Sequence, residues 1–230
     1  MPAKPAQVIV FIPHPDDAES RMAGTVALWV REGKEVIYVV CTNGDKGTDD
    51  PNTKPEELAK VREQEQLAAA ELLGVREVIF LHHPDQSLED TPEFRKDIVR
   101  LIRMYKPYTV VTVDPYRGYL DHRDHRITAR VTLDAIFPYA RDANSYPELL
   151  EQGLQPHRVS EVLLCGTEDP NYYIDITDTI DIKMAALRCH KSQVGDRPEL
   201  EEWIRQWAKT SAEGQDYEYA EVFHREEIWW

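Results

Sequence analysis

Two clusters of histidine and aspartate contain the residue types that chemistry at a metal needs. Residues 13–17 (PHPDD) follow an apolar run at 8–12, and residues 121–125 (DHRDH) follow another at 108–113. Imidazoles and carboxylates are zinc ligands, and catalytic zinc keeps three protein ligands with a fourth position open to water. Together the clusters supply such a set, with a carboxylate and a histidine to spare for acid–base work.

Each cluster alone also has a plain structural explanation. A His-Pro-Asp-Asp segment can be a turn followed by a helix cap, because proline fixes φ and aspartate accepts backbone N–H bonds. His122 and His125 are three residues apart, so they share one face at a helix start, and such pairs are often surface residues. We favour the combined interpretation because a parallel sheet brings the ends of its strands together at one edge.

The elements that must position these clusters form an alternating pattern. Strands are predicted at 8–12, 36–41, 77–81 and 108–113, and helices at 18–31, 54–73, 92–104 and 122–137. Strands that are apolar throughout and separated by helices indicate a parallel sheet covered on both faces. We therefore predict an α/β fold, a single-domain Rossmann-like three-layer sandwich with a mostly parallel sheet.

The second half of the chain is less regular. A polar connection at 141–155 precedes expected strands at 159–165 and 172–176, expected helices at 177–190 and 198–212, and an aromatic stretch at 217–230. Because no linker separates two compositions, we expect one domain over residues 1–230, with an irregular part from about 141 to 230 that completes the substrate site and mediates oligomerisation.

Composition excludes several classes of protein. The 230 residues include 42% hydrophobic and 30% charged side chains, and 27 Lys+Arg against 42 Asp+Glu give a net charge of −15. This charge repels nucleic acid and anionic membranes. The three cysteines favour a reducing, cytoplasmic location. No apolar run approaches the roughly 20 residues of a membrane span, and no signal-peptide pattern is evident.

With these motifs in hand, the chain resembles the PIG-L/LmbE-like zinc-dependent N-acetylglucosaminide deacetylases. The resemblance rests on PHPDD at 13–17 and DHRDH at 121–125. Weaker matches are TNGDKG at 42–47, REQE at 62–65, FLHHPD at 80–85 and KMAALRCHKSQ at 183–193. They cover nearly the whole chain in the family's order, and the aromatic C-terminal region is similar to that of the archaeal diacetylchitobiose deacetylases.

The resemblance implies roles for residues in both clusters. His14, Asp17 and His125 match the family's zinc ligands, and Asp16 matches the general base that activates water. His122 matches the residue that polarises the amide and stabilises the oxyanion. The implied cofactor is Zn²⁺.

Further residues are candidates for binding substrate. Arg62 and Asp85 match the family's sugar-binding positions, although Arg62 alone also fits an exposed helix charge paired with a nearby glutamate. Arg117 lies just before the second cluster, and Asp45 stands where the family often has glutamate. His224 matches a histidine that helps form the active site, in some members of a neighbouring subunit.

The implied function is a zinc hydrolase that removes the N-acetyl group from a GlcNAc-containing sugar or conjugate. The alternatives are an amidase that cleaves a larger acyl group or a thiol conjugate from a glucosamine core, and a non-catalytic sugar-binding member of the same fold. A nucleotide-binding protein is disfavoured because the first turn carries acidic residues instead of a G-x-G-x-x-G pattern. Tryptophans near the C-terminal end favour a homo-oligomer, and the related archaeal enzymes imply a trimer or hexamer.

Overall fold

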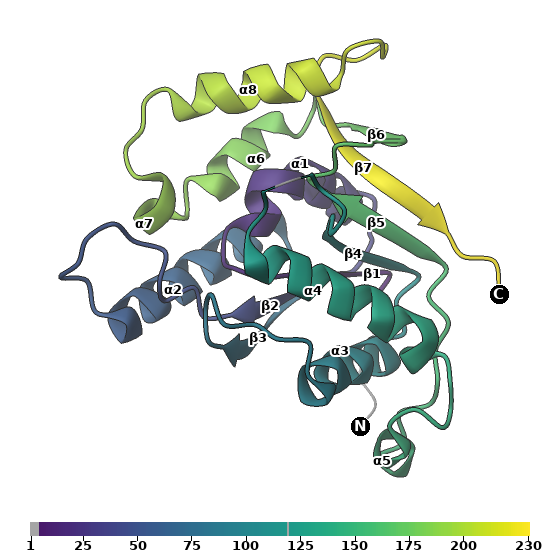
Figure 1. Ribbon diagram of the computed structural model, residues 1–230. Helices are drawn as coiled ribbons and strands as arrows, with labels where there is room; N and C mark the ends of the chain where they lie inside the picture. The colour runs from purple at the N-terminus through teal and green to yellow at the C-terminus, as the bar shows by residue number, and fades with distance from the viewer. Residues whose placement is uncertain (1–4, 119) are drawn as a thin grey trace.

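One mixed β-sheet organises the computed structural model, which describes residues 5–118 and 120–230 (Figure 1). Its seven strands have the order β3-β2-β1-β4-β5-β7-β6. The strands are β1 (Val8–Ile12), β2 (Val36–Thr42), β3 (Glu77–His83), β4 (Thr109–Val113), β5 (Glu161–Cys165), β6 (Tyr172–Asp175) and β7 (Ala220–Glu227). The first five run parallel, and β7 is antiparallel to both β5 and β6.

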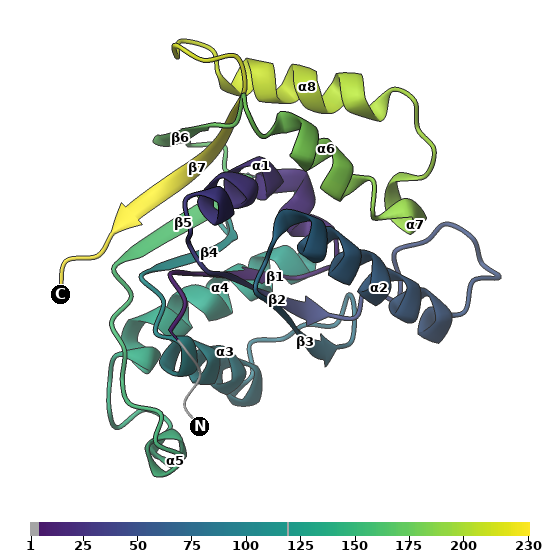
Figure 2. The ribbon, with the colours of Figure 1, turned by 180° about the vertical axis from the view of Figure 1, so that it is seen from behind.

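Helices cover both faces of the sheet, as the opposite views of Figures 1 and 2 show. One face packs against α1 (Asp17–Arg31), α2 (Pro55–Leu73), α6 (Ile180–Leu187) and α8 (Leu200–Ser211), with the short α7 (Lys191–Val194) nearby. The other packs against α3 (Pro92–Tyr105), α4 (Arg123–Asp134), a π-helical turn (Ala135–Ala140) and α5 (Pro147–Glu151). These three layers confirm the predicted fold class.

Alternation along the strands divides the core into two halves. In β1, Val8, Val10 and Ile12 pack toward α1, whereas Ile9 and Phe11 pack toward α3. Every residue of this strand is buried, because both of its faces are covered by helices. Burial of both faces explains why the sequence of this strand is apolar throughout, the feature from which the strand was predicted.

The region after residue 134 departs most from the sequence prediction. The helix expected at 122–137 ends at Asp134 and continues as a π-helical turn that contains Pro138, a residue without a backbone N–H to donate. The connection at 141–155 contains α5. The aromatic stretch at 217–230 contains β7, which was not predicted as a strand.

The order of the strands places the two histidine–aspartate clusters side by side. The sheet grows in one direction from β1 through β2 to β3, and in the other from β4 to β5. β1 pairs directly with β4, with Phe11 opposite Thr112, so the two strands end at the same level. Where the strand order changes direction, between β1 and β4, a crevice forms at the carboxyl ends of the strands. Ligands bind in such crevices in open α/β sheets.

Across the two described stretches of the chain, no helix is both long enough and apolar enough to cross a membrane.

The strand that was not predicted should be essential to the core. Phe223 of β7 has no exposed surface, so Phe223→Ala should lower the free energy of unfolding by about 3–5 kcal/mol. Phe137, half exposed, is the control, and Phe137→Ala should cost less than half as much. Urea denaturation followed by circular dichroism measures both, and equal losses would contradict this role of β7.

Candidate metal centre

The carboxylate of Asp17 lies between two imidazoles. Its Oδ2 is 3.2 Å from His14 Nδ1, and its Oδ1 is 3.3 Å from His125 Nε2. His14 follows β1, Asp17 begins α1 and His125 lies in the first turn of α4. Zinc ligands about 2.0–2.1 Å from the ion lie roughly 3.3 Å apart in a tetrahedral site. The Asp17 carboxylate therefore contacts both predicted histidine ligands at a spacing that fits zinc, through a different oxygen for each. Donor atoms of His14, His122 and His125 lie within 4.8 Å of one another.

Two further carboxylates contact the other nitrogen of His14. Asp85 Oδ1 is 3.1 Å and Asp124 Oδ2 is 3.4 Å from His14 Nε2. Asp124 is fully buried, and its carboxylate also accepts the N–H groups of Gln86 and Leu88. A metal-ligating histidine usually has its second nitrogen held by a carboxylate, which fixes the ring orientation. Asp124 matches that arrangement.

Asp124 had no predicted role. The only signal was the extra acidic residue inside the second cluster. Asp85, a predicted sugar-binding residue, contacts His14 and accepts the backbone N–H of Lys46, and its role in sugar binding stays a prediction. Because His14, Asp85, His122 and Asp124 also form a set of donor atoms within 4.8 Å of one another, the site is rich in metal-ligating groups on both sides of the His14 ring.

The electrostatics of the cluster favour a positive charge. Burial lowers the pKa of His14, but its hydrogen bonds with Asp124, Asp17 and Asp85 outweigh burial and raise this pKa to about 11. Burial raises the pKa of Asp17, yet His125 and His14 hold it well below its usual range. Carboxylates gathered in a buried site favour any bound cation. The negative potential of these carboxylates favours a divalent metal ion.

His122 is arranged to donate a hydrogen bond as a neutral ring. Its Nδ1 accepts the N–H of Asp124 at 3.1 Å and caps α4, so the hydrogen of the neutral ring is on Nε2. Burial, with the charges of His14 and His125, lowers the pKa of His122. Its ring stands edge-on to His14 with the centroids 4.7 Å apart, so the Nε2–H belongs to the same cluster.

Asp16 occupies a strained position beside the metal ligands. Its φ of 92° is left-handed, and a non-glycine residue there needs support from its surroundings. The support is a hydrogen bond from its N–H to Gln66 Oε1 at 3.1 Å. Burial, together with the charge of Asp17, raises the pKa of Asp16 to about 6. Asp16 therefore binds a proton more tightly than Asp17, whose pKa is lowered.

Arg62 is buried, so the alternative of an exposed helix charge is wrong. It is 4% exposed and donates to the carbonyls of Gly44 and Pro15 at 2.8 and 2.6 Å, with Asp16 Oδ2 3.5 Å away. A Cβ on Gly47 would lie 2.3 Å from its Nη1, so this glycine leaves room for the guanidinium. Arg62 thus links the loops after β1 and β2.

Comparisons with known proteins show the family of the chain. The family model for PIG-L, described as GlcNAc-PI de-N-acetylase, matches residues 9–136. The chain belongs to the PIG-L family. It is 36% identical to a diacetylchitobiose deacetylase of Thermococcus kodakarensis, over 81% of this chain and 70% of the relative.

Two further known proteins match over greater lengths. A probable N-acetyl-alpha-D-glucosaminyl L-malate deacetylase 2 of Bacillus subtilis is 31% identical over 97% of this chain and 96% of the relative. The N,N'-diacetylchitobiose deacetylase of Pyrococcus horikoshii, crystallised with an inhibitor, superimposes with a TM-score of 0.90 at 34% identity, covering 96% of this chain and 84% of that one.

Two residues predicted to bind substrate, Asp45 and Arg117, and one predicted to help form the active site, His224, have partners outside the set of His14, Asp17 and His125. Asp45 is in the loop after β2 and accepts a hydrogen bond from Asn43. Arg117 lies 3.9 Å from Asp121, which in turn contacts His125. His224 lies on β7, where its ring contacts the Asp169 carbonyl and Glu226. No hydrogen bond or ion pair between described residues joins His224 to the cluster, so its role stays a prediction.

The hydrogen bond that supports Asp16 continues into the interior. Gln66 Nε2 donates to Glu19 Oε1, and Glu19 Oε2 contacts His190 Nε2, each at 3.0 Å. Glu19, Gln66 and His190 have no exposed surface. These buried hydrogen bonds tie the backbone of Asp16 to the segment between α6 and α7.

A second buried contact stabilises a break in α1. Met22 has non-helical angles, φ −148° and ψ 15°, which interrupt the helical hydrogen bonds. Glu221 of β7 accepts the N–H groups of Gly24 and Thr25 at 3.1 and 2.7 Å. Lys183 of α6 donates to the Ser20 carbonyl at 2.8 Å and to Glu221 at 2.6 Å. The ion pair thus satisfies backbone groups on both sides of the break.

Removing one charge of this pair should destabilise the protein strongly. Lys183 and Glu221 are 2% and 4% exposed, so Lys183→Met should cost about 3–5 kcal/mol by leaving a buried carboxylate unpaired. The double variant Lys183→Met/Glu221→Gln should recover part of this loss. Urea denaturation of both, with the parent and Glu221→Gln, gives the coupling energy.

The exposed pair Lys54–Glu57 is the control, and Lys54→Met should cost about 1 kcal/mol or less. Equal losses for Lys183→Met and Lys54→Met would contradict a bracing role for the buried pair.

Proposed function

We propose that this PIG-L family member is a zinc-dependent N-deacetylase that hydrolyses the acetamide of a GlcNAc-containing sugar or conjugate. The observation that carries the proposal is the placement of the Asp17 carboxylate between His14 and His125 at 3.2 and 3.3 Å, with Asp16 beside it. The relatives named above as deacetylases of diacetylchitobiose and of glucosaminyl L-malate support this reaction class.

The proposed ligands of the ion are His14, Asp17 and His125. Asp85 and Asp124 hold the second nitrogen of His14, which leaves the first nitrogen for the metal. When bound, zinc supplies Lewis-acid polarisation of the amide carbonyl and a lowered pKa for water. The remaining chemistry belongs to side chains of this chain.

Asp16 is the proposed general base. It is next to a ligand in sequence, but Arg62 and Gln66 hold it apart from the ligand set. A carboxylate with a raised pKa takes a proton from water more readily than an ordinary aspartate. Asp16 would accept that proton and then return it to the departing nitrogen, so that the products are a free amine and acetate.

His122 is the proposed donor to the oxyanion. Its Nδ1 is occupied by the N–H of Asp124, so the neutral ring presents Nε2–H to the charge that develops on the carbonyl oxygen. A donor held in place before the reaction stabilises that charge without reorganisation. Arg62, Asp85, Arg117 and Asp45 are the proposed substrate-side residues, with Arg62 acting by positioning.

Exposed tryptophans support the proposal of a homo-oligomer. Trp203 and Trp207 of α8 are 62% and 41% exposed, and Trp229 is 89% exposed. Tryptophan is enriched at protein interfaces relative to the rest of the surface. The trimer or hexamer expected from the sequence, with His224 acting in its own or a neighbouring subunit, belongs to this proposal.

Asp16→Asn should separate catalysis from metal binding. The variant keeps all three ligands, so it should retain about one zinc per chain while acetate release from N-acetylated amino sugars falls about 10²–10⁴-fold. Asp17→Asn should lose zinc, and Asp178→Asn, at an exposed surface position, should retain full activity. Elemental analysis and an acetate assay measure the outcome, and a near-parental rate for Asp16→Asn would refute the assigned base.

His122→Asn should remove the oxyanion donor while keeping the helix cap. Asparagine is a good N-cap residue, so α4 should retain its capping hydrogen bond, but the shorter side chain does not reach the position of Nε2. We expect kcat to fall about 10²–10³-fold with KM little changed. Steady-state kinetics measure the two constants; a rise in KM alone would assign His122 to substrate binding instead.

A further inference from the structure

Residues 183–193 carry a motif that the proposed function does not use, yet they contact the elements that hold the general base. The segment comprises the second half of α6, the following turn and the start of α7. Two of its side chains, those of Lys183 and His190, reach the first turn of α1, the helix that follows Asp16. Each of these two contacts leads to a different backbone group of Asp16.

The contact made by His190 leads to the backbone N–H of Asp16. As a carboxylate, Glu19 can only accept hydrogen bonds. The Gln66 amide therefore turns its NH2 group toward Glu19 Oε1 and its oxygen toward the Asp16 N–H. The other oxygen of Glu19 is 3.0 Å from His190 Nε2. His190 thus holds Glu19 in place, and Glu19 sets the direction in which the Gln66 amide points.

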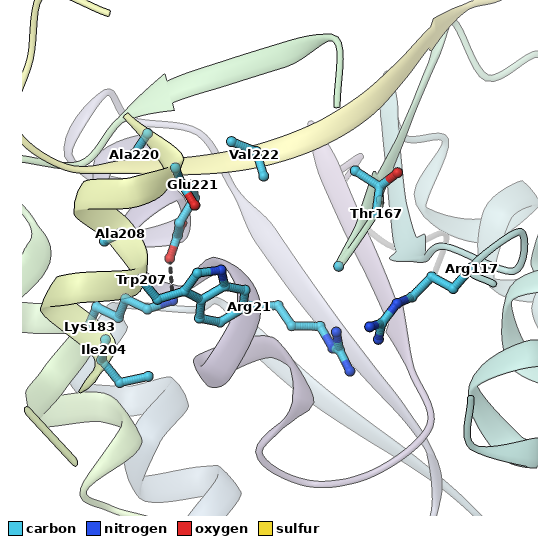
Figure 3. Close-up of a pocket in the computed structure, with 12 residues that line it drawn as sticks. Arg21, Arg117, Thr167, Lys183, Ile204, Trp207, Ala208, Ala220, Glu221 and Val222 are labelled. Atoms are coloured by element: carbon cyan, nitrogen blue, oxygen red, sulfur yellow. Dashed lines mark hydrogen bonds and ion pairs between the residues drawn. The ribbon is translucent and has the colours of Figure 1, made fainter. Parts of the chain in front are cut away.

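The contact made by Lys183 leads to the backbone carbonyl of Asp16. This carbonyl accepts the N–H of Ser20 at 3.0 Å, and the Ser20 carbonyl accepts a hydrogen bond from Lys183 Nζ at 2.8 Å. Lys183 also pairs with Glu221, and Figure 3 shows this ion pair in the wall of a pocket beside α8 and β7. Both backbone groups of Asp16 are therefore connected to residues 183–190.

The same segment also contacts the helix that carries Gln66. Ser192 donates to the Glu65 carboxylate through its N–H and its hydroxyl, at 2.7 and 2.6 Å. Gln193 Nε2 donates to the carbonyl of Gly47, in the loop after β2, at 3.0 Å. The segment therefore connects α1, α2 and the loop after β2 around the general base.

The backbone of Asp16 needs support because its conformation is uncommon. Its φ of 92° lies in a region that residues other than glycine seldom adopt. The direction of the Asp16 Cβ depends on this angle, and the next residue, Asp17, is a proposed metal ligand. A different φ would therefore move the carboxyl group of the base relative to the proposed ligands.

We propose that Gln66, Glu19 and His190 are positioning residues, which set the orientation of the general base through its backbone. The proposal rests on the proposed function, in which Asp16 is that base. Orientation matters to the rate because a misplacement of about 1 Å at the reacting groups can cost about 10²-fold.

The test exchanges the amide and the carboxylate of the buried pair. Gln66→Glu sets two carboxylates against each other, so the hydrogen bond between positions 66 and 19 is lost. In the double variant Gln66→Glu/Glu19→Gln the donor and the acceptor change places. The amide now at position 19 donates to position 66 and accepts from His190, and position 66 still accepts the Asp16 N–H.

We expect Gln66→Glu to lower kcat for acetate release from N-acetylglucosamine about 10²-fold, with zinc content and KM near the parental values. Its Asp16 amide should exchange hydrogen for deuterium at least about tenfold faster, as measured by NMR. The double variant should recover both quantities to within about threefold of the parent. A merely structural role would lower the free energy of unfolding without this split between kcat and KM. If Gln66→Glu does not fold, Gln66→Met replaces it, because methionine removes both hydrogen bonds without adding a charge.

Arg188→Gln is the matched control, because Arg188 lies in the same segment but is exposed and pairs with Glu201. It should leave kcat and amide exchange unchanged. Parental kcat and exchange in Gln66→Glu, or losses that persist in a folded double variant, would overturn the proposal. If the unmodified protein releases no acetate from N-acetylated amino sugars, the proposed deacetylase is contradicted. Faster exchange of the Asp16 amide in Gln66→Glu, with recovery in the double variant, would still support the positioning contacts.

Discussion

Negative charge gathered around one buried imidazole is the constraint on which the rest of the structure depends. The loops after β1, β3 and β4 each contribute a carboxylate near His14, namely Asp17, Asp85 and Asp124. Buried carboxylates are unfavourable unless a cation or N–H groups compensate them. The same negative charge that favours a cation at His14 is the basis of the metal site and of the chemistry proposed above.

Two buried glutamates farther from that site, Glu19 and Glu221, also have partners that compensate their charge. Glu19 is satisfied by His190 and Gln66, and Glu221 by Lys183 and the backbone of α1. These contacts join segments far apart in the sequence and converge on the part of α1 from Glu19 to Thr25. The residues that hold substrate-facing groups in place therefore come from the whole length of the chain.

The layers and the location of the site were predictable because both depend on local sequence. Continuous apolar runs mark buried parallel strands, and the two clusters follow strands that the topology makes neighbours. Contacts across long separations were not predictable: Asp124 meets His14 across 110 positions and Gln66 meets Asp16 across 50. β7 was missed because its glutamates obscure the strand pattern, although one of them, Glu221, is buried against Lys183.

The position of β7 also has a consequence for biosynthesis. This strand separates β5 from β6, yet it is translated after every other strand of the sheet. Strand pairings between distant segments form slowly, and until β7 inserts, β5 exposes an open edge and α1 lacks Glu221 at its break. The β3-to-β5 layer is therefore complete in the nascent chain before β7 is translated, and α1 gains its contacts with Glu221 only when this last strand enters between two that are already made.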